Sequence, residues 1–546
     1  MLVTSGTFTG NGARRTITLA FAPKVVFIKG DQALHGMFHT PNQWCGRSVG
    51  MSNLESGNNL IRIVGNTIRL GTDAKVAASG VNFIWGALGE DTTDDLETQS
   101  WLGRGAIALP IALQKGFTPK AMFIKRDNAL SGILRVSPLN GGAGRGLDGA
   151  TLAGEPVTGV TSGLVTLAAS VNNVNQYDSA NGIGEGIDGV FVSSASTSCE
   201  VVAWTGTGSS GTVTIAMPNP KFAFIYRDDA TQTNQARIAV VGTTLPMGAT
   251  AAVANDAVLN SGNISFSTGF GGVSGVPFKA IVFGGVDGTP AEAPTIITSG
   301  KKAVYLPGRD IASVIDCGVS DATLNISGAM TVEWFGIPFV PGLSNKIGQL
   351  IGRGLGPIDT ANGYSWASLL VATDETTTEL FWPGGQYMVV PLPQIGIGKP
   401  LDTCAWRTGI LGKYGAAQHV ITTHDGAGGW KLIVNGVLVK QRVKPLATNI
   451  ASVSGHRTGI GAWQNGSGWA DPLRMAFIGA RVYNRQLNLS EAATRFSIAA
   501  LGSAAADVTT GLAEVWDAST ASGTLLPAQV NTQNSGTIVN GQIVML

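Results

Sequence analysis

The residue types best suited to ligand binding gather in one glycine-containing segment, residues 463–471 (WQNGSGWAD). Sugars stack their apolar faces on aromatic rings and exchange hydrogen bonds with amide and carboxylate groups, and this segment supplies both kinds of group. Because Trp463 follows a glycine-containing apolar run that is typical of a core strand, we expect one of the two rings to be structural. The candidate glycan-binding residues are Trp463, Gln464, Asn465, Trp469 and Asp471.

Carboxylates and serines do not occur at the spacings that known hydrolases need. A β-sandwich glucanase carries carboxylates spaced Glu-x-Asp-x-x-Glu on one strand, so that an acid and a nucleophile flank the glycosidic bond. Glu333 has no such neighbours, and the segment 514–517 (EVWD) lacks the third carboxylate. The string Gly-x-Ser-x-Gly at 46–50 lies in an expected loop, whereas a hydrolase nucleophile needs a strand-to-helix turn. We therefore expect that the chain is not an enzyme and has no catalytic residues.

The patterns of histidine and acidic residues give little support to a metal site. His35 and His39 are four residues apart without any sign of a helix, and His419 and His424 would point to opposite faces of a strand. The acidic run 90–97 (EDTTDDLE) has the oxygen atoms that Ca²⁺ prefers, but it lacks the glycine and the ligand spacing of a calcium loop. A solvated linker is therefore favoured here. We expect no metal and no cofactor, and Ca²⁺ at this run is the one alternative.

Length and composition exclude several classes of protein. A chain of 546 residues holds several domains. With a formal net charge of +1 and no basic block, it cannot neutralise a run of phosphates, so we expect no nucleic-acid binding. No run approaches about 18 apolar residues, and the first residues lack the basic start of a secretory signal. We expect a soluble protein without membrane insertion, made in a cytosol.

The cysteines and the glycines add two further expectations. The four cysteines are far apart in the sequence and form no CxxC pair, which predicts buried free thiols rather than a zinc site or a disulfide framework. Charged residues make up only 13% of the chain, and 75 residues are glycine. This combination suits a subunit that hides surface in an assembly. The cysteines are Cys45, Cys199, Cys317 and Cys404.

An internal repeat organises the first half of the chain. An aromatic-x-Gly-x-Gly element is followed by a strand-like run that begins with Pro-Lys, and the pair recurs at intervals of roughly a hundred residues. Short β-branched runs separated by Gly, Asn and Ser predict a small antiparallel β-sandwich for each copy. The apolar run after Pro-Lys is nearly continuous, so we expect that strand to be covered on both faces. The runs begin at Pro23, Pro119 and Pro220, and the three modules are 1–95, 96–198 and 199–295.

From about residue 296 the sequence changes to a longer β-rich block with three signatures. Residues 330–335 (MTVEWF) alternate like an opening strand. Asn435-Gly436 separates two apolar runs and predicts a type I′ hairpin, because both residues tolerate a positive φ. Residues 477–487 form a closing strand that leads into Asn488 and Glu491, which have the spacing of a capping box at a helix start.

In this order, the signatures resemble the laminin-G-like, concanavalin-A-like sandwich family over residues 296–500. The resemblance implies an all-β jelly-roll sandwich after the three small β modules. Residues 501–546 are too short for a core of their own. We expect this C-terminal extension to lie on the last domain or on a neighbouring subunit.

The whole arrangement resembles bacteriophage virion proteins, especially tail-fibre and host-recognition subunits, in which repeated modules of this kind are joined to a laminin-G-like domain. The resemblance implies a structural protein of the virion, assembled in the bacterial host cytoplasm. It also implies that the chain forms a homo-oligomer, most often a trimer, and contacts other virion proteins and a host cell-surface polysaccharide. We expect the modules to stack and set length, and the 296–500 domain to recognise the host.

Two alternatives remain open from the sequence. The first is a purely architectural capsid or neck decoration protein whose modules bind only neighbouring subunits. The second is a polysaccharide depolymerase.

Overall fold

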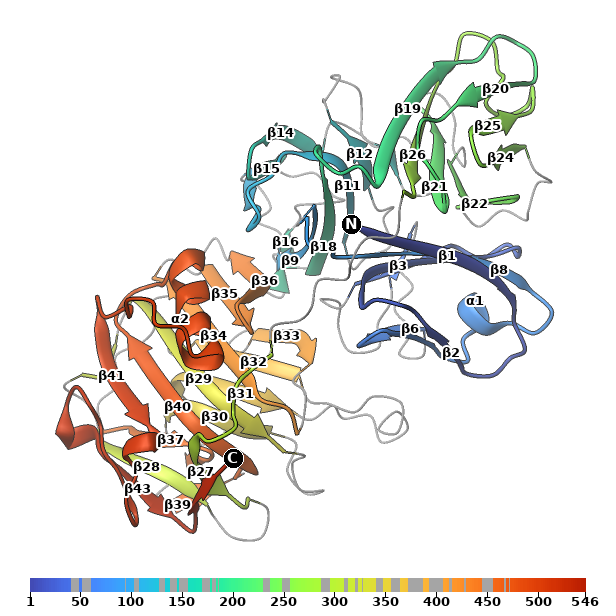
Figure 1. Ribbon diagram of the computed structural model, residues 1–546. Coiled ribbons are helices and arrows are strands. Elements are labelled where there is room, and N and C mark those ends of the chain that lie inside the picture. The colour runs from blue at the N-terminus through green and yellow to red at the C-terminus, as the bar shows by residue number, and fades with distance from the viewer. Residues whose placement is uncertain are drawn as a thin grey trace. The chain divides into compact units, whose positions relative to one another are not determined.

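The computed structural model confirms the all-β prediction, with several antiparallel sheets and little helix (Figure 1). The chain forms two compact units, an N-terminal unit (residues 1–178 and 184–292) and a C-terminal unit (residues 179–183 and 293–546). The structure describes all residues except 41–48, 52–59, 94, 103–107, 127–132, 138–144, 147–155, 169–176, 179–182, 185, 229–235, 248–255, 286–294, 309–312, 320–322, 327, 340–346, 355–363, 372–385, 392–405, 412–414, 427–428, 444–454, 466–467 and 471.

The N-terminal unit contains three copies of one topology, each with a five-stranded and a three-stranded antiparallel sheet. In the first copy the orders are β1(Leu2–Thr9)-β8(Asn82–Gly89)-β3(Pro23–Gly30)-β4(Met37–His39)-β5(Val49–Gly50) and β2(Arg15–Thr18)-β7(Thr67–Leu70)-β6(Ile61–Val64), with α1(Ala74–Ala77). In the second they are β9(Leu96–Leu102)-β18(Gly186–Ser193)-β11(Pro119–Arg126)-β12(Ile133–Val136)-β13(Arg145–Gly146) and β10(Leu109–Ala112)-β15(Leu164–Leu167)-β14(Val157–Thr161), with the pair β16(Tyr177–Asp178)-β17(Ile183–Gly184). In the third they are β19(Cys199–Thr205)-β26(Pro277–Phe283)-β21(Phe222–Arg227)-β22(Ala236–Val240)-β23(Thr243–Pro246) and β20(Gly211–Thr214)-β25(Asn263–Phe266)-β24(Ala257–Leu259).

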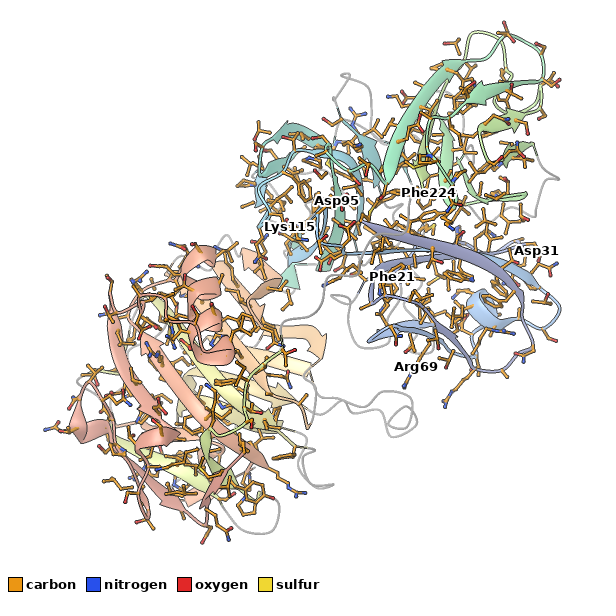
Figure 2. The ribbon with its side chains drawn as sticks, viewed as in Figure 1. Phe21, Asp31, Arg69, Asp95, Lys115 and Phe224 are labelled. Carbon is orange, nitrogen blue, oxygen red and sulfur yellow. The ribbon has the colours of Figure 1, made fainter. Side chains whose placement is uncertain are left out.

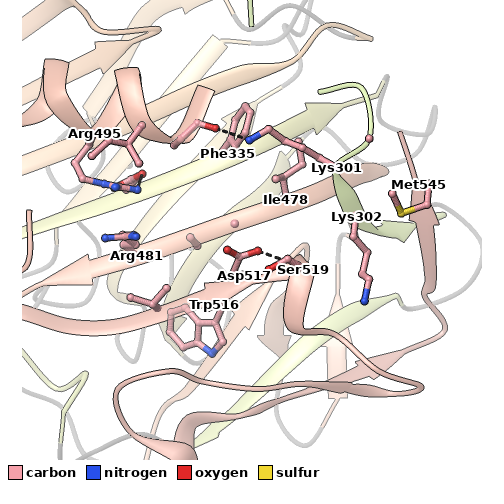
Figure 3. Close-up of a pocket in the computed structure, with 17 residues that line it drawn as sticks. Lys301, Lys302, Phe335, Ile478, Arg481, Arg495, Trp516, Asp517, Ser519 and Met545 are labelled. Carbon is pink, nitrogen blue, oxygen red and sulfur yellow. Dashed lines mark hydrogen bonds and ion pairs between the residues drawn. The ribbon is translucent and has the colours of Figure 1, made fainter. Parts of the chain in front are cut away.

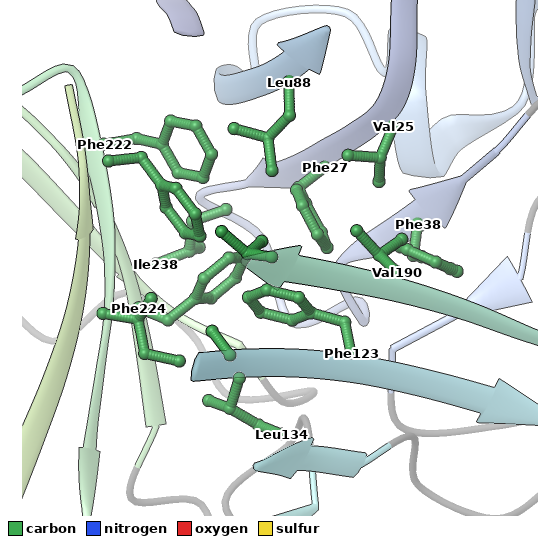
Figure 4. Close-up of a cluster of buried hydrophobic side chains, with 14 of the residues drawn as sticks. Val25, Phe27, Phe38, Leu88, Phe123, Leu134, Val190, Phe222, Phe224 and Ile238 are labelled. Atoms are coloured by element: carbon green, nitrogen blue, oxygen red, sulfur yellow. The ribbon is translucent and has the colours of Figure 1, made fainter. Parts of the chain in front are cut away.

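The three modules share one buried core, which differs from the expected linear stack (Figure 4). The fifth residue of each Pro-Lys run is a phenylalanine, and the rings of Phe27, Phe123 and Phe224 contact one another pairwise at centroid distances of 5.2, 4.8 and 5.0 Å. Positions that are equivalent in the repeat therefore meet in space. In the first and third modules, the other face of the five-stranded sheet packs on that module's own three-stranded sheet. The Pro-Lys strand is covered on both faces, as predicted.

The C-terminal unit is a sandwich of two large antiparallel sheets. One has the order β36(Val437–Val443)-β35(Gly429–Val434)-β34(Gln418–Asp425)-β29(Ala329–Pro338)-β40(Met475–Tyr483)-β27(Lys302–Leu306)-β44(Gln542–Met545), and β41(Leu512–Asp517) also pairs with β40. The other has the order β33(Trp406–Leu411)-β32(Gln386–Pro391)-β31(Tyr364–Val371)-β30(Ile347–Gly354)-β37(Arg457–Ile460)-β28(Val314–Val319)-β43(Gly536–Val539)-β42(Leu525–Leu526). Smaller elements are the hairpin β38(Trp463–Asn465)-β39(Gly468–Ala470), helix α2(Leu489–Leu501) and the 3₁₀ turns η2(Ala518–Thr520) and η3(Thr532–Asn534).

Local signals in this unit act as the sequence suggests. Asn435 and Gly436 both have positive φ, 52° and 79°, in the turn between β35 and β36. Asn488 and Glu491 form a reciprocal capping box at the start of α2, each side chain accepting the other's backbone N–H at 2.9 Å. The segment 501–546, expected as an extension, supplies β41, β43 and β44, so it contributes strands to both sheets of the sandwich.

Candidate functional site

The predicted glycan segment forms the hairpin β38–β39 in the C-terminal unit. Gln464 is buried, and its Oε1 accepts the backbone N–H of Arg457 at 3.0 Å, so this amide supports the neighbouring strand. Trp469 is half-buried, and its ring lies against Gly459, where an added Cβ would come within 2.4 Å of the ring atom Cζ3. The side chains of Trp463 and Asn465, and all of Asp471, lie outside the described residues. Glycan contact by these five residues stays a prediction.

A pocket of about 530 Å³ opens elsewhere in the same unit, on the face of the β40 sheet that carries helix α2 (Figure 3). Six parts of the chain line it: β29, β40, the last two turns of α2, the β41–η2 corner, β44, and the segment 300–302 that leads into β27. These parts are far apart in the sequence, and the pairing of β40 with β27 and β41 brings them together.

One of the residues that line the floor of the pocket is a glycine. Gly479 on β40 pairs with Asp517 of β41, and an added Cβ at Gly479 would meet only the carbonyl oxygen of Trp516, at 3.4 Å. Any larger side chain at Gly479 would extend into the pocket. The surrounding floor is apolar, formed by Ile478, Ala480 and Val515.

Two lysines flank the mouth of the pocket, one on the α2 side and one on the η2 side (Figure 3). The Nζ of Lys301 donates to the carbonyl oxygen of Ala499 in the last turn of α2 at 2.9 Å and lies 5.4 Å from the centroid of the Phe335 ring. The Nζ of Lys302 donates to the carbonyl oxygen of Ala521 at 3.1 Å. The bonds of both lysines thus go to neutral carbonyl oxygens, and each ammonium has further N–H groups to donate.

Hydrogen-bond acceptors lie on the η2 side of the pocket, the side on which Lys302 is bound. One carboxylate oxygen of Asp517, Oδ1, accepts the backbone N–H of Ser519 at 2.8 Å and caps η2. Asp517 is half-buried and Ser519 is exposed, so the second carboxylate oxygen and the hydroxyl can reach a molecule in the pocket. The pocket thus combines an apolar floor with ammonium, carboxylate and hydroxyl groups.

The back wall is a network of charges that is already satisfied internally, buried at Glu333, His419 and Arg495 and exposed at Asp507. Arg495 of α2 donates from Nε and Nη2 to the two oxygens of Glu333 at 3.0 and 2.9 Å, and His419 Nε2 lies 2.9 Å from Glu333 Oε1. Arg495 and Arg481 also share Asp507, at 2.6 and 2.7 Å. Burial alone would raise the pKa of Glu333, but the hydrogen bond from His419 and the charge of Arg495 lower it to about 2. Both Glu333 oxygens are engaged, so this carboxylate has a structural part in the wall.

The acidic run 90–97 is not the solvated linker that the sequence favoured. Glu90 pairs with Lys24 at 3.1 Å and with Lys115 at 2.9 Å. Figure 2 labels Lys115 and also Asp95, which belongs to the acidic run. Glu97 is buried, and its two oxygens accept the backbone N–H groups of Gln114 and Lys115 at 2.8 and 3.0 Å. The carboxylates of Glu90 and Glu97 are therefore bound to cations and amides within the fold, which the charge pattern alone could not reveal. Within the described residues, no group of three or more His, Cys, Asp or Glu side chains is placed to hold a metal ion.

The other residues singled out in the sequence take ordinary positions. His39 is buried on β4, and His424 Nδ1 lies 3.1 Å from the carbonyl oxygen of Gly328. Cys199 and Cys317 are buried free thiols. Cys45, Cys404 and residues 46–48 of the Gly-x-Ser-x-Gly string lie outside the described residues. No helix in the described part of the chain is long and apolar enough to cross a bilayer.

Sequence reasoning missed the pocket because its residues show no common motif. The one available signal was Gly479, a glycine within an apolar strand, since such a glycine often marks a close approach of backbone or ligand. Lys301 and Lys302 stand at the start of a strand, where charged residues are unremarkable.

No family model matches this sequence, and no curated protein sequence matches it. Solved structures with similarity include a protein from Bacteroides ovatus ATCC 8483 to which carbohydrate binding is attributed, with 13% identity and a TM-score of 0.31 over 84% of this chain and 94% of that one. A heptameric SAP-like pentraxin from Limulus polyphemus has 12% identity and a TM-score of 0.25, over 44% and 97%. The CBM40 of the Ruminococcus gnavus IT-sialidase, bound to α2,3-sialyllactose, has 14% identity and a TM-score of 0.22, over 36% and 98%. Sequence identity this low does not indicate that two proteins bind the same ligand.

Proposed function

We propose that the chain is a non-enzymatic structural subunit of a bacteriophage virion, part of a tail fibre or another appendage, and that its C-terminal sandwich binds a glycan of the host surface. The pocket above Gly479 carries the glycan part of the proposal. It offers an apolar floor with a few convergent polar groups that retain hydrogen-bonding capacity, which is the usual make-up of a small-molecule site.

The virion part of the proposal is supported by the sequence resemblance and by the way the modules pack. The apolar strands of three modules meet around Phe27, Phe123 and Phe224, so the first half of the chain forms one firmly packed block. A block of this kind suits a structural subunit that presents a binding domain. The proposal includes assembly into a homotrimer and contact with other virion proteins, and native mass spectrometry of the full chain should show the trimer. A monomer at micromolar concentration would count against that part.

Binding to host cells tests the glycan proposal. We expect the full chain to bind host cells, and Gly479→Leu to abolish binding because the new side chain fills the pocket. Gly262→Leu is the matched control, because a Cβ at Gly262, in the N-terminal unit, meets nothing within 4 Å. Both variants should keep the melting temperature of the unmodified chain. If Gly479→Leu binds as well as the control, the pocket is not the site. If the unmodified chain does not bind, the architectural alternative is favoured, and release of oligosaccharide would favour the depolymerase.

A further inference from the structure

The charges around the pocket are unevenly balanced. Arg481 and Arg495 belong to the internal network and are neutralised there by Glu333 and Asp507. The other charged side chains that line the pocket are those of Lys301, Lys302 and Asp517. The pocket therefore has one ammonium, Lys301, on the α2 side, and on the η2 side it has Lys302 together with the carboxylate of Asp517.

The two ammonium groups are fixed in place before any ligand arrives. The ammonium of Lys301 is hydrogen-bonded to the last turn of α2 and lies over the Phe335 ring. The ammonium of Lys302 is hydrogen-bonded to the end of η2. A bond to a neutral carbonyl leaves the positive charge uncompensated, so each lysine can form a charge-assisted hydrogen bond with an anionic group. Because the side chains are already ordered, little conformational entropy is lost when that bond forms.

Asp517 restricts the kind of anion that fits. Its carboxylate would repel an inorganic anion or a ligand that is negative throughout, but it accepts hydrogen bonds from hydroxyl groups. A ligand that satisfies both walls has an acidic group at one end and hydroxyl groups at the other. The volume of about 530 Å³ lies within the range of about 300–1,000 Å³ that is usual for small-molecule pockets.

We propose that this pocket binds an acidic sugar residue of a polysaccharide, with its carboxylate facing Lys301 on the α2 side and its hydroxyl groups facing Asp517 and Ser519 on the η2 side. The inference rests on the proposed glycan-binding function and names the ligand class of that same site. The apolar floor around Gly479 lies against the ring face of the sugar.

Calorimetry with the full chain tests this assignment, using three probes: an oligogalacturonate, its methyl ester and a neutral hexose oligosaccharide. The oligogalacturonate should bind, and the methyl ester should bind roughly tenfold more weakly because it has lost its charge. The double variant Lys301→Gln/Lys302→Gln should lose affinity for the acid by about the same factor, and the double variant to Arg should retain most of it. Lys221→Gln, which removes one lysine charge from the N-terminal unit, is the control and should bind like the unmodified chain.

The outcomes separate the inference from the proposed function. Equal affinity for the acid and its ester, or binding of the neutral oligosaccharide alone, would overturn the acidic sugar and leave glycan binding intact. If the double Gln variant keeps full affinity for the oligogalacturonate, the two lysines do not contribute to binding. Binding to host cells without binding to any probe would also contradict the acidic sugar. Failure to bind both probes and cells would contradict the proposed function itself.

Discussion

Phe27 and Phe224 belong to different modules of the chain, yet their rings meet edge to face with centroids 4.8 Å apart. Each is the fifth residue of a Pro-Lys run, and Phe123, the fifth residue of the remaining run, contacts both. In a homotrimer the same residue of three subunits can meet around the symmetry axis. Here the equivalent residues of three modules in a single chain meet in the same way. This internal packing covers apolar strand faces that a separate module would expose.

Truncation of one central ring should destabilise the whole N-terminal unit. Phe224→Ala removes a fully buried ring that contacts two other modules, so we expect a loss of about 3–5 kcal/mol in the free energy of unfolding. Chemical denaturation of the full chain measures this loss. Val241→Ala in the same module is the control, since Val241 is 51% exposed and its truncation should change stability by about 0.5 kcal/mol or less. Equal effects of the two changes would show that the shared core is not important for stability.

An isolated first module should associate with itself. A fragment of residues 1–95 exposes the sheet face that carries Phe27, and three copies can place this ring where Phe123 and Phe224 lie in the full chain. We expect sedimentation to show a trimer, and Phe27→Glu to prevent its formation because the charge would be buried at the centre. A fragment that unfolds cooperatively as a monomer would contradict this view of the core.

The sequence predicted local structure well because local structure depends on neighbouring residues. The Pro-Lys runs, the Asn435-Gly436 turn and the capping box of Asn488 can each be recognised within about ten residues of chain. It also predicted that the Pro-Lys strands are covered on both faces. It could not show what covers them, because Phe27 and Phe21 have the same chemistry, although the first lies in the shared core and the second in its own module.

The pocket was beyond sequence reasoning for a related reason. Its walls come from residues near 300, 335, 480, 498, 517 and 545, and the pairing of β40 with β27, β29 and β41 and the packing of α2 bring them together. The hairpin β38–β39, by contrast, was predicted as a glycan-binding segment because its polar and aromatic residues are contiguous in the sequence. Gln464 shows the weakness of that signal, since its amide is buried and bonded to the backbone of Arg457.

Thiol reactivity should separate the cysteines of the folded chain. Burial raises the pKa of Cys199 to about 12, and the Cys317 thiol is likewise buried with a raised pKa, so neither forms thiolate near neutral pH. In the native protein we expect no reaction of Cys199 or Cys317 with a thiol reagent, as mapped by mass spectrometry. After denaturation without reductant, four thiols per chain should react, because proteins assembled in a reducing cytosol seldom hold disulfides. Fewer than four would contradict assembly in a reducing compartment.

The ion pair behind the pocket should make the C-terminal unit sensitive to acid. The folded-state pKa of Glu333 is about 2, below its ordinary value of 4.5, so the ionised carboxylate stabilises the fold above about pH 4.5 and this contribution is lost as the pH falls toward 2. The melting temperature of the unit should fall across that window. Glu333→Gln should remove this part of the pH dependence. It should also cost about 3–5 kcal/mol at neutral pH, because Arg495 stays buried without its main partner. If the melting temperature of Glu333→Gln falls as steeply between pH 4.5 and 2 as that of the unmodified chain, another group is responsible for the acid sensitivity.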